Sequence, residues 1–322
     1  MMFVEPKPKL FVFGACDLHQ SIKIDMIAHK FTRDLIRTEK DTLDFETCNV
    51  PPFSTSMLSL YTKPNELANR VHETLIKTKN VRRYHYALYK EIVKFPYLKY
   101  FKENAGPKDI LVMNLSSELY TKIKAKSETF TIIPIPDARI YDGKDQLHWL
   151  YKEYINKDEY IVPFDDEQSL NETYDVLQDF ARDVYEIFQD RVVLVKTHVT
   201  NLALGSMADI EKVKIPLNGT IPFYKPSRIM QDPLDHTYAQ RATNLLLNKF
   251  RKWYKAELPI VSVSDGIFLD YNHPYGYSPF HLHISSCTKI GLNIYDELVK
   301  IKNKTQLKEN IDDNTNTNTN IK

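Results

Sequence analysis

Short runs of consecutive apolar residues alternate along the chain with longer segments in which apolar residues recur every three to four positions. The first run, 9–14, reads Lys-Leu-Phe-Val-Phe-Gly and is typical of a strand buried on both faces. Further runs at 109–115, 129–134, 191–196 and 258–263 predict four more strands. These runs are apolar at successive positions, which favours a parallel sheet covered on both sides.

Two intervening segments, 173–189 and 235–257, carry the pattern of an amphipathic helix. The apolar stripes consist of Leu177, Phe180, Ala181, Val184 and Phe188 in the first, and Tyr238, Ala242, Leu245, Leu246, Phe250, Trp253 and Tyr254 in the second. Strands that alternate with helices predict an α/β protein. We expect a three-layer α/β/α sandwich with a mainly parallel central sheet.

The chain of 322 residues is long enough for one large domain. We predict a single α/β domain over 1–305, with a loop excursion at 201–233 that is rich in proline and glycine. The segment 306–322 ends in an Asn-Thr repeat, and its composition predicts a disordered tail.

Charge balance and the number of cysteines exclude some classes of partner and compartment for this protein. The chain has 43 basic and 42 acidic residues, a balance that argues against a nucleic-acid partner. The alternating Lys122, Lys124 and Lys126 are read as a solvated edge or helix face. Three cysteines without zinc-binding spacing suit a reducing compartment, and no apolar run reaches the length of a membrane span. We therefore expect a cytoplasmic protein; the oligomeric state stays open.

The first candidate for chemistry is Cys16, which follows the first predicted strand. Asp17 is placed to cap a helix that begins there, and a thiolate at a helix N-terminus is stabilised by the helix dipole. Cys16 therefore suits the role of an acyl-accepting nucleophile. The alternative is a small buried side chain that fills a tight turn.

The second candidate is the pair Asp270 and His273, in a loop that follows the last predicted strand. A carboxylate three residues before a histidine can hold one ring nitrogen and leave the other as a base. The alternative is a turn-forming Asp270 beside a spacer histidine. His281 and His283 suggest a metal site only weakly, and we predict no metal. His198, which follows the strand at 191–196, is a further candidate at the same sheet edge.

These motifs resemble known sequence blocks. Gly14-Ala15-Cys16-Asp17 resembles the first block of the SGNH/GDSL hydrolase superfamily, and Asp270-x-x-His273 resembles its last block. The chain is more closely similar to SGNH-like bacterial proteins often associated with surface-polysaccharide genes. Those proteins have Gly-Ser-Cys after the first strand, a Ser-x-x-Ser segment and a final Asp-x-x-His-x-x-Gly-x-Ser-Pro-Phe-His. The counterparts here are 14–16, Ser56 with Ser59, and 270–281.

The resemblance implies an SGNH/flavodoxin-like sheet and an acyl (acetyl) transferase or esterase that acts on a carbohydrate or polysaccharide precursor. It makes Cys16 the nucleophile, His273 the base and Asp270 the residue that orients the base. It implies no bound cofactor beyond an acyl donor such as acetyl-CoA. The candidate substrate-binding residues are Gly14, Asp17, Ser56, Ser59, Asn114, Ser116, His198 and His281.

The sequence also departs from the family pattern. Ala15 stands where the closer group has Ser and the wider superfamily has Asp. Asn114, Ser116 and Ser117 lie roughly where the superfamily has an oxyanion-binding Asn, while its oxyanion-binding Gly has no counterpart. The alternative function is therefore a catalytically degenerate SGNH-like protein that binds a glycan or takes part in assembly during surface-polysaccharide biosynthesis.

Overall fold

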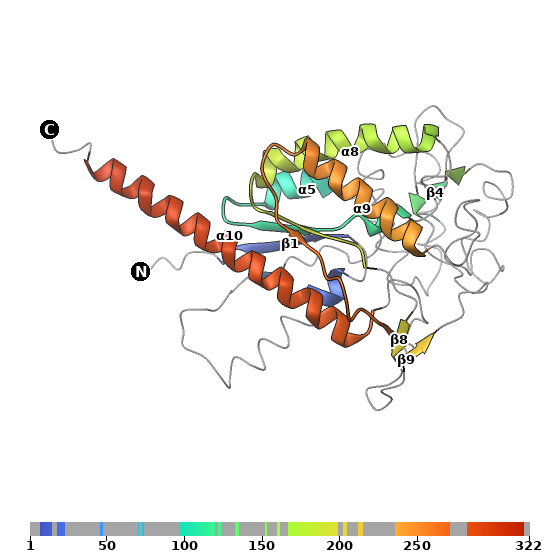
Figure 1. Cartoon of the computed structure of the whole chain (residues 1–322). Helices are drawn as coiled ribbons and strands as arrows, with labels where there is room; N and C mark the ends of the chain where they lie inside the picture. Colours follow the sequence, from blue (N-terminus) through green and yellow to red (C-terminus); the bar gives the residue numbers. More distant parts are fainter. Residues whose placement is uncertain are drawn as a thin grey trace.

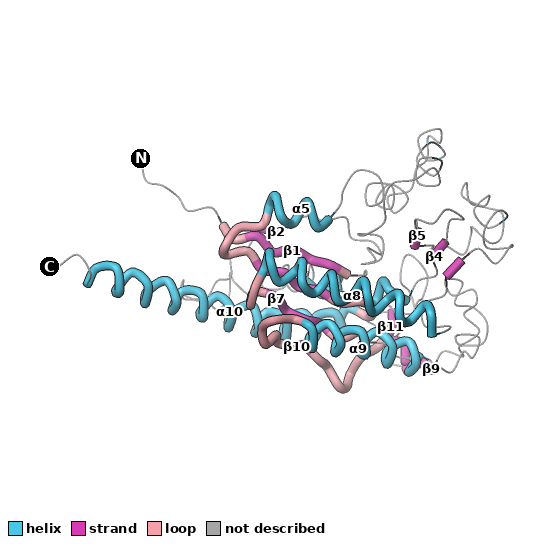
Figure 2. The backbone as a smooth tube through the Cα atoms, turned by 90° about the horizontal axis from the view of Figure 1, so that it is seen from above, coloured by secondary structure: helices cyan, strands magenta, loops and turns pink. Residues whose placement is uncertain are grey.

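The computed structural model has an ordered α/β core built on one parallel sheet (Figures 1 and 2). The residues that the structure describes are 7–14, 18–22, 46–47, 70, 73, 97–119, 122–123, 133–134, 152, 160–161, 167–198, 202–204, 212–214, 236–270 and 282–318. No helix within these ranges is long and apolar enough to cross a membrane.

The main sheet has five parallel strands in the order β10-β7-β3-β1-β2. The strands are β1 (Lys9–Phe13), β2 (Glu46–Thr47), β3 (Ile110–Met113), β7 (Val192–Val195) and β10 (Ile260–Val261). Numbered among themselves, they follow the order 2-1-3-4-5, which is one of the common orders of open parallel α/β sheets. In such a sheet the order in which successive strands are added reverses between the first and third strands, and ligands bind beyond the carboxyl ends there.

The predictions of an α/β protein and of a parallel sheet are confirmed. Four of the predicted strands appear as β1, β3, β7 and β10, each shorter than its apolar run. The fifth run, 129–134, contains only the short β5 (Ile133–Pro134) among its described residues, and β5 lies outside the main sheet. The two predicted helices appear as α8 (Glu167–Phe188) and α9 (His236–Trp253).

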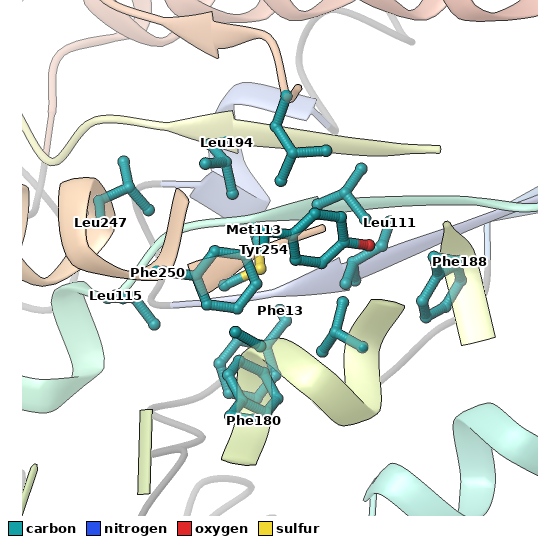
Figure 3. Packing of buried hydrophobic residues seen from close by; sticks show 14 of the residues in the cluster. Phe13, Leu111, Met113, Leu115, Phe180, Phe188, Leu194, Leu247, Phe250 and Tyr254 are labelled. Carbon is teal, nitrogen blue, oxygen red and sulfur yellow. The ribbon is translucent and has the colours of Figure 1, made fainter. Parts of the chain in front are cut away.

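Aromatic residues dominate the core on one face of the sheet, where α5 (Tyr97–Asn104), α8 and α9 pack (Figures 1 and 3). The Phe13 ring lies 5.1 Å from that of Phe180 on α8, and the Phe11 ring lies 5.5 Å from that of Phe188. Buried rings in tilted and edge-to-face pairs add about 0.5–1.5 kcal/mol each to the burial of their area. These contacts hold α8 against the first strand.

The opposite face is aliphatic and is covered by α10 (Ile284–Asn318), which extends beyond the sheet (Figure 1). The sheet contributes the alternate positions, such as Val12, Val112 and Val193. The buried stripe of α10 consists of Cys287, Ile290, Ile294, Leu298 and Ile301, at the three-to-four spacing of a helix. The helix continues to Asn318, within the segment where composition predicts disorder; the division into a domain and a tail stays a prediction.

Two small sheets flank the core. One has the order β11-β8-β9 and consists of β11 (Leu269–Asp270), β8 (Leu202–Leu204) and β9 (Lys212–Lys214). Antiparallel β8 and β9 therefore lie within the predicted loop excursion at 201–233. The other small sheet has the order β5-β4-β6, with β4 (Lys122–Ile123) and β6 (Tyr160–Ile161) antiparallel to each other.

A charged cluster closes the amino edge of the main sheet, before β3 and β7 begin. Arg191 donates to the carbonyl oxygens of Gly106 at 2.8 Å, Asp109 at 2.5 Å and Ile187 at 3.2 Å. The Asp109 carboxylate accepts the backbone N–H groups of Lys9 and Gly106, both at 2.6 Å. Burial lowers the pKa of Arg191, and the Asp109 carboxylate opposes part of that effect. We call Arg191, Asp109 and the backbone groups they bind the Arg191 cluster.

Candidate functional site

The predicted site residues that the structure describes all lie at the end of a strand or just after it. Gly14 follows β1, Asn114 and Ser116 follow β3, His198 follows β7, and Asp270 ends β11. Because β1, β3 and β7 are parallel, the first four residues belong to the carboxyl edge of one sheet. The predicted site residues outside the described ranges are Cys16, Asp17, Ser56, Ser59, His273 and His281, and their roles stay predictions.

Gly14 and Asn114 are in close contact where the first and third strands end. The backbone N–H of Asn114 donates to the carbonyl of Phe13 at 2.9 Å, which carries the β1–β3 ladder one step past the strands. A Cβ atom on Gly14 would lie 2.2 Å from Oδ1 of Asn114 and 3.1 Å from Cδ2 of Leu18. Gly14 also has a backbone φ of 152°, which residues other than glycine rarely adopt. The turn after β1 therefore requires glycine on two grounds.

Ser116 fixes the orientation of the Asn114 side chain. Its hydroxyl donates to Oδ1 of Asn114 at 2.8 Å, and both side chains are fully buried. Ser116 opens the 3-10 helix η3 (Ser116–Leu119), which holds the hydroxyl next to the amide. Because Oδ1 is the acceptor in this bond, Nδ2 is the donor end of the amide. The bond therefore fixes the amide with Oδ1 toward Ser116 and next to the turn that leads to Cys16.

His198 links the ends of β7 and β10. Its Nε2 accepts the backbone N–H of Val263 at 2.9 Å, so the neutral ring carries its proton on Nδ1. Burial lowers the pKa of His198 from 6.5 to about 4, and the nearby charge of Lys196 adds to the effect. The geometry shows a histidine that joins two strand ends as a neutral acceptor; its predicted contact with substrate stays a prediction.

Asp270 stands on a strand pair that continues the pairing of β7 with β10. Partners lie 66 positions apart both in the β7–β10 ladder (260 against 194) and in the β8–β11 ladder (269 against 203). The two chain segments therefore leave the main sheet together and pair again in the same register. We call the pair of β8 with β11 the extension. Asp270 lies at its end, and the His198–Val263 bond lies between the main sheet and this pair.

The same extension contributes to the aliphatic core of the main sheet. Leu269 belongs to one buried cluster with Leu18 and Leu282, and Leu18 opens the helical residues 18–22 that follow the Gly14 turn. The residue before Asp270 thus packs in the same core as the residue four positions after Gly14. The structure brings Gly14, Asn114 and Ser116 together, and it places Leu269 in the aliphatic core of the sheet.

Sequence reasoning missed the residues of α10 that hold this extension. His283 caps α10, because its Nδ1 accepts the N–H of Ser285 at 3.3 Å, and the Oγ of Ser285 lies 2.8 Å from the same nitrogen. Ser286 bonds to both backbone groups of Phe268, and Leu269 forms an antiparallel bridge with Leu282. The signal that was available is the helical spacing from Cys287 to Ile301, which predicts a helix after the final loop.

Among the described residues, no three His, Cys, Asp or Glu side chains are grouped so that they could hold a metal ion. Comparison of the chain with models of protein families, with curated proteins and with solved structures gives no match.

Proposed function

We propose that the chain is an acyl (acetyl) transferase or esterase that acts on a carbohydrate or polysaccharide precursor. The proposed fold of the whole domain is the three-layer α/β/α sandwich of SGNH/flavodoxin-like proteins. The strand order 2-1-3-4-5 and the helices on each face of the sheet support this fold. Fold alone never proves an activity, so the proposal depends on the residues at the carboxyl edge.

The observation that carries the proposal is the contact between Gly14 and Asn114. An acyl transfer needs a nucleophile and, about one hydrogen bond from the reacting carbonyl, donors that stabilise the oxyanion. Here the turn after β1 leads to Cys16 two residues later, and the oriented amide of Asn114 lies against that turn. Because Ser116 holds Oδ1, the amide Nδ2 of Asn114 is the group that we propose as an oxyanion donor, a role that the sequence assigned only by approximate position.

The proposed reaction has two steps. The Cys16 thiolate attacks the acyl carbonyl, and the Asn114 amide donates to the oxygen that becomes negative. A thioester to Cys16 forms as the acyl C–O bond of an ester donor, or the acyl C–S bond of acetyl-CoA, breaks. His273 takes the thiol proton and gives it to the leaving alcohol or thiol. A sugar hydroxyl or water, deprotonated by His273, then attacks the thioester and releases Cys16. Asp270 holds the far ring nitrogen of His273.

Trapping of the acyl-enzyme tests this function directly. The protein is mixed with p-nitrophenyl acetate or acetyl-CoA, and peptide mass spectrometry locates the acetyl group. We expect an adduct of one acetyl group on Cys16, and loss of both adduct and turnover in Cys16→Ala. Cys287→Ala is the matched control, since Cys287 is a fully buried thiol on α10.

Variants of the other residues separate an enzyme from a binding protein. Asn114→Ala removes the proposed oxyanion donor, and we expect kcat to fall about 100- to 1000-fold. Turnover that survives in Cys16→Ala overturns the proposed nucleophile. Absence of any adduct or turnover, combined with saturable binding of an acetylated oligosaccharide, supports the glycan-binding alternative instead.

A further inference from the structure

We infer that Ser286 on α10 is a positioning residue for Asp270: its hydroxyl fixes Phe268 and thereby sets where β11 delivers the carboxylate. This inference rests on the proposed function, because it gives Asp270 the role of orienting His273. Ser286 itself touches neither substrate nor the reacting atoms.

The Ser286 hydroxyl bonds to both backbone groups of one residue. Its Oγ accepts the N–H of Phe268 at 2.7 Å and donates to the carbonyl of Phe268 at 3.1 Å. In an extended chain, the N–H and C=O of one residue point to the same side, where a neighbouring strand normally pairs with them. A side chain of α10 therefore takes the place of a strand at the residue that begins the approach to β11.

Additional backbone contacts place the same segment between α10 and β8. The N–H of His283 donates to the carbonyl of Phe268 at 2.8 Å, and Leu282 forms an antiparallel bridge with Leu269. On the other side, Leu269 and Asp270 pair with β8 in parallel register. β11 has only two residues, so these contacts contribute a large share of what holds it in place.

The preceding residues also make contacts with the segment that follows β7 and with α10. The N–H of Val263 is held by His198 at 2.9 Å, and the Asp265 carboxylate lies 2.7 Å from the Lys289 ammonium on α10. Asp270 lies two residues beyond Phe268, a distance of about 7 Å in an extended strand. A shift at Phe268 therefore reaches the carboxylate over a short stretch of backbone.

A purely local role for Ser286 is the ordinary alternative. Serine in the first turn of a helix commonly bonds to backbone groups of its own helix. The Oγ bonds of Ser286 instead join a residue 18 positions earlier in the chain, and the side chain is fully buried. Thr288 shows the local pattern, because its hydroxyl donates to the carbonyl of Ile284 at 2.9 Å within α10. Thr288→Ala is consequently the matched control.

Kinetics gives the first test. In Ser286→Ala the N–H of Phe268 loses its partner, and we expect kcat to fall about 10- to 100-fold while KM changes less than about 2-fold. Thr288→Ala keeps the kcat of the wild type. Ser286→Cys retains the volume with a weaker donor, and it serves as the second variant if Ser286→Ala does not fold.

A test that needs no turnover uses the NMR spectrum of His273, assigned with His273→Gln. An imidazole N–H held by a carboxylate gives a low-field proton resonance, which Asp270→Asn removes. We expect Ser286→Ala to remove or shift this resonance and Thr288→Ala to leave it unchanged. Circular dichroism and the urea midpoint verify that the variants are folded.

The outcomes separate the two proposals. If Asp270→Asn changes neither the resonance nor kcat, the Asp270–His273 pair is overturned, and the role of Ser286 with it. If Asp270→Asn has its effect but Ser286→Ala behaves like Thr288→Ala, only the positioning role is overturned. Loss of the resonance in Ser286→Ala, with a split between kcat and KM, supports it.

Discussion

The two edges of the main sheet bury polar groups in different ways. At the amino edge, the Arg191 cluster buries two full charges and satisfies them with backbone groups from three segments of the chain. At the carboxyl edge, Asn114, Ser116 and His198 are buried as groups that are neutral at pH 7. The first arrangement ties segments together, whereas the second presents oriented donors and acceptors.

This contrast predicts different effects of substitution at the two edges. A buried charge destabilises strongly when its partner is lost, so the Arg191 cluster is intolerant of change. Neutral amide and hydroxyl groups carry a smaller desolvation cost, which lets a site hold them ready for a charge that develops during reaction. Variants at the amino edge should therefore change stability alone, and variants at the carboxyl edge should change activity as well.

The largest expected effect comes from breaking the Arg191 cluster. Arg191→Ala removes three hydrogen bonds to backbone carbonyls and the positive charge near the Asp109 carboxylate, which should lower the free energy of unfolding by about 3–5 kcal/mol. Urea denaturation measures the change. Arg191→Lys keeps the charge but loses the planar guanidinium group, so we expect its free energy of unfolding to lie between those of the wild type and Arg191→Ala. A loss below 1 kcal/mol would contradict the comparison of the two edges.

The neutral His198 should make the carboxyl edge sensitive to acid. Its pKa is about 4 in the folded protein and 6.5 in the unfolded chain, so between these values the unfolded state binds more protons. The stabilisation is complete above pH 6.5 and is lost as pH falls toward 4, amounting to about 3 kcal/mol. Urea titrations across this range measure the slope.

His198→Gln provides the control for this slope. The Gln amide oxygen can accept the N–H of Val263 but does not titrate, so the variant should lose stability less steeply with falling pH. Burial also lowers the pKa of His19 to about 4, and part of the slope should therefore remain in His198→Gln. A slope equal to that of the wild type would show that His198 is not the titrating group.

The long elements of the fold could be predicted from the sequence. The apolar runs of β1, β3 and β7 and the apolar stripe of α8 each extend over several residues, so the pattern of apolar positions alone identified these elements. The run 129–134 misled because it ends at Pro134, which cannot donate in a ladder and here stands on an edge strand of a small sheet. The two or three residues of β8, β9 and β11 are too few for a periodic pattern.

The location of the candidate site could be predicted, but its supports could not. Residues directly after buried strands face the carboxyl edge, which is why Gly14, Asn114 and His198 were candidates. The bonds from Ser286 to Phe268 and from His198 to Val263 join residues 18 and 65 positions apart. Such contacts depend on how α10 and the final strand pack, and no local pattern in the sequence encodes that packing.

Alanine at two glycines sharpens the contrast between the edges. In Gly14→Ala the new Cβ would lie 2.2 Å from Oδ1 of Asn114, and alanine would have to adopt a φ of 152°. We therefore expect the free energy of unfolding to fall by about 1–3 kcal/mol and the Asn114 amide to be displaced. Turnover should fall together with stability. The backbone groups of Gly106 belong to the Arg191 cluster, but in Gly106→Ala the atom nearest to the new Cβ is Oδ2 of Asp109 at 3.5 Å, an ordinary contact. Here we expect less than 1 kcal/mol and no change in kcat; equal effects at both sites would contradict the contrast.

The smallest expected effect concerns the Asp265–Lys289 ion pair on the segment that leads to β11. Both side chains are exposed, and exposed pairs contribute little to folding. The hydrogen bond and charge of Lys289 lower the pKa of Asp265, which shows contact without implying stability. Asp265→Asn should leave the urea midpoint unchanged, and it should leave kcat unchanged because the bonds of Ser286 to Phe268 remain. If kcat instead falls as far as in Ser286→Ala, the position of Asp270 depends on the whole segment from Val263 to Phe268 rather than on the Ser286 hydroxyl.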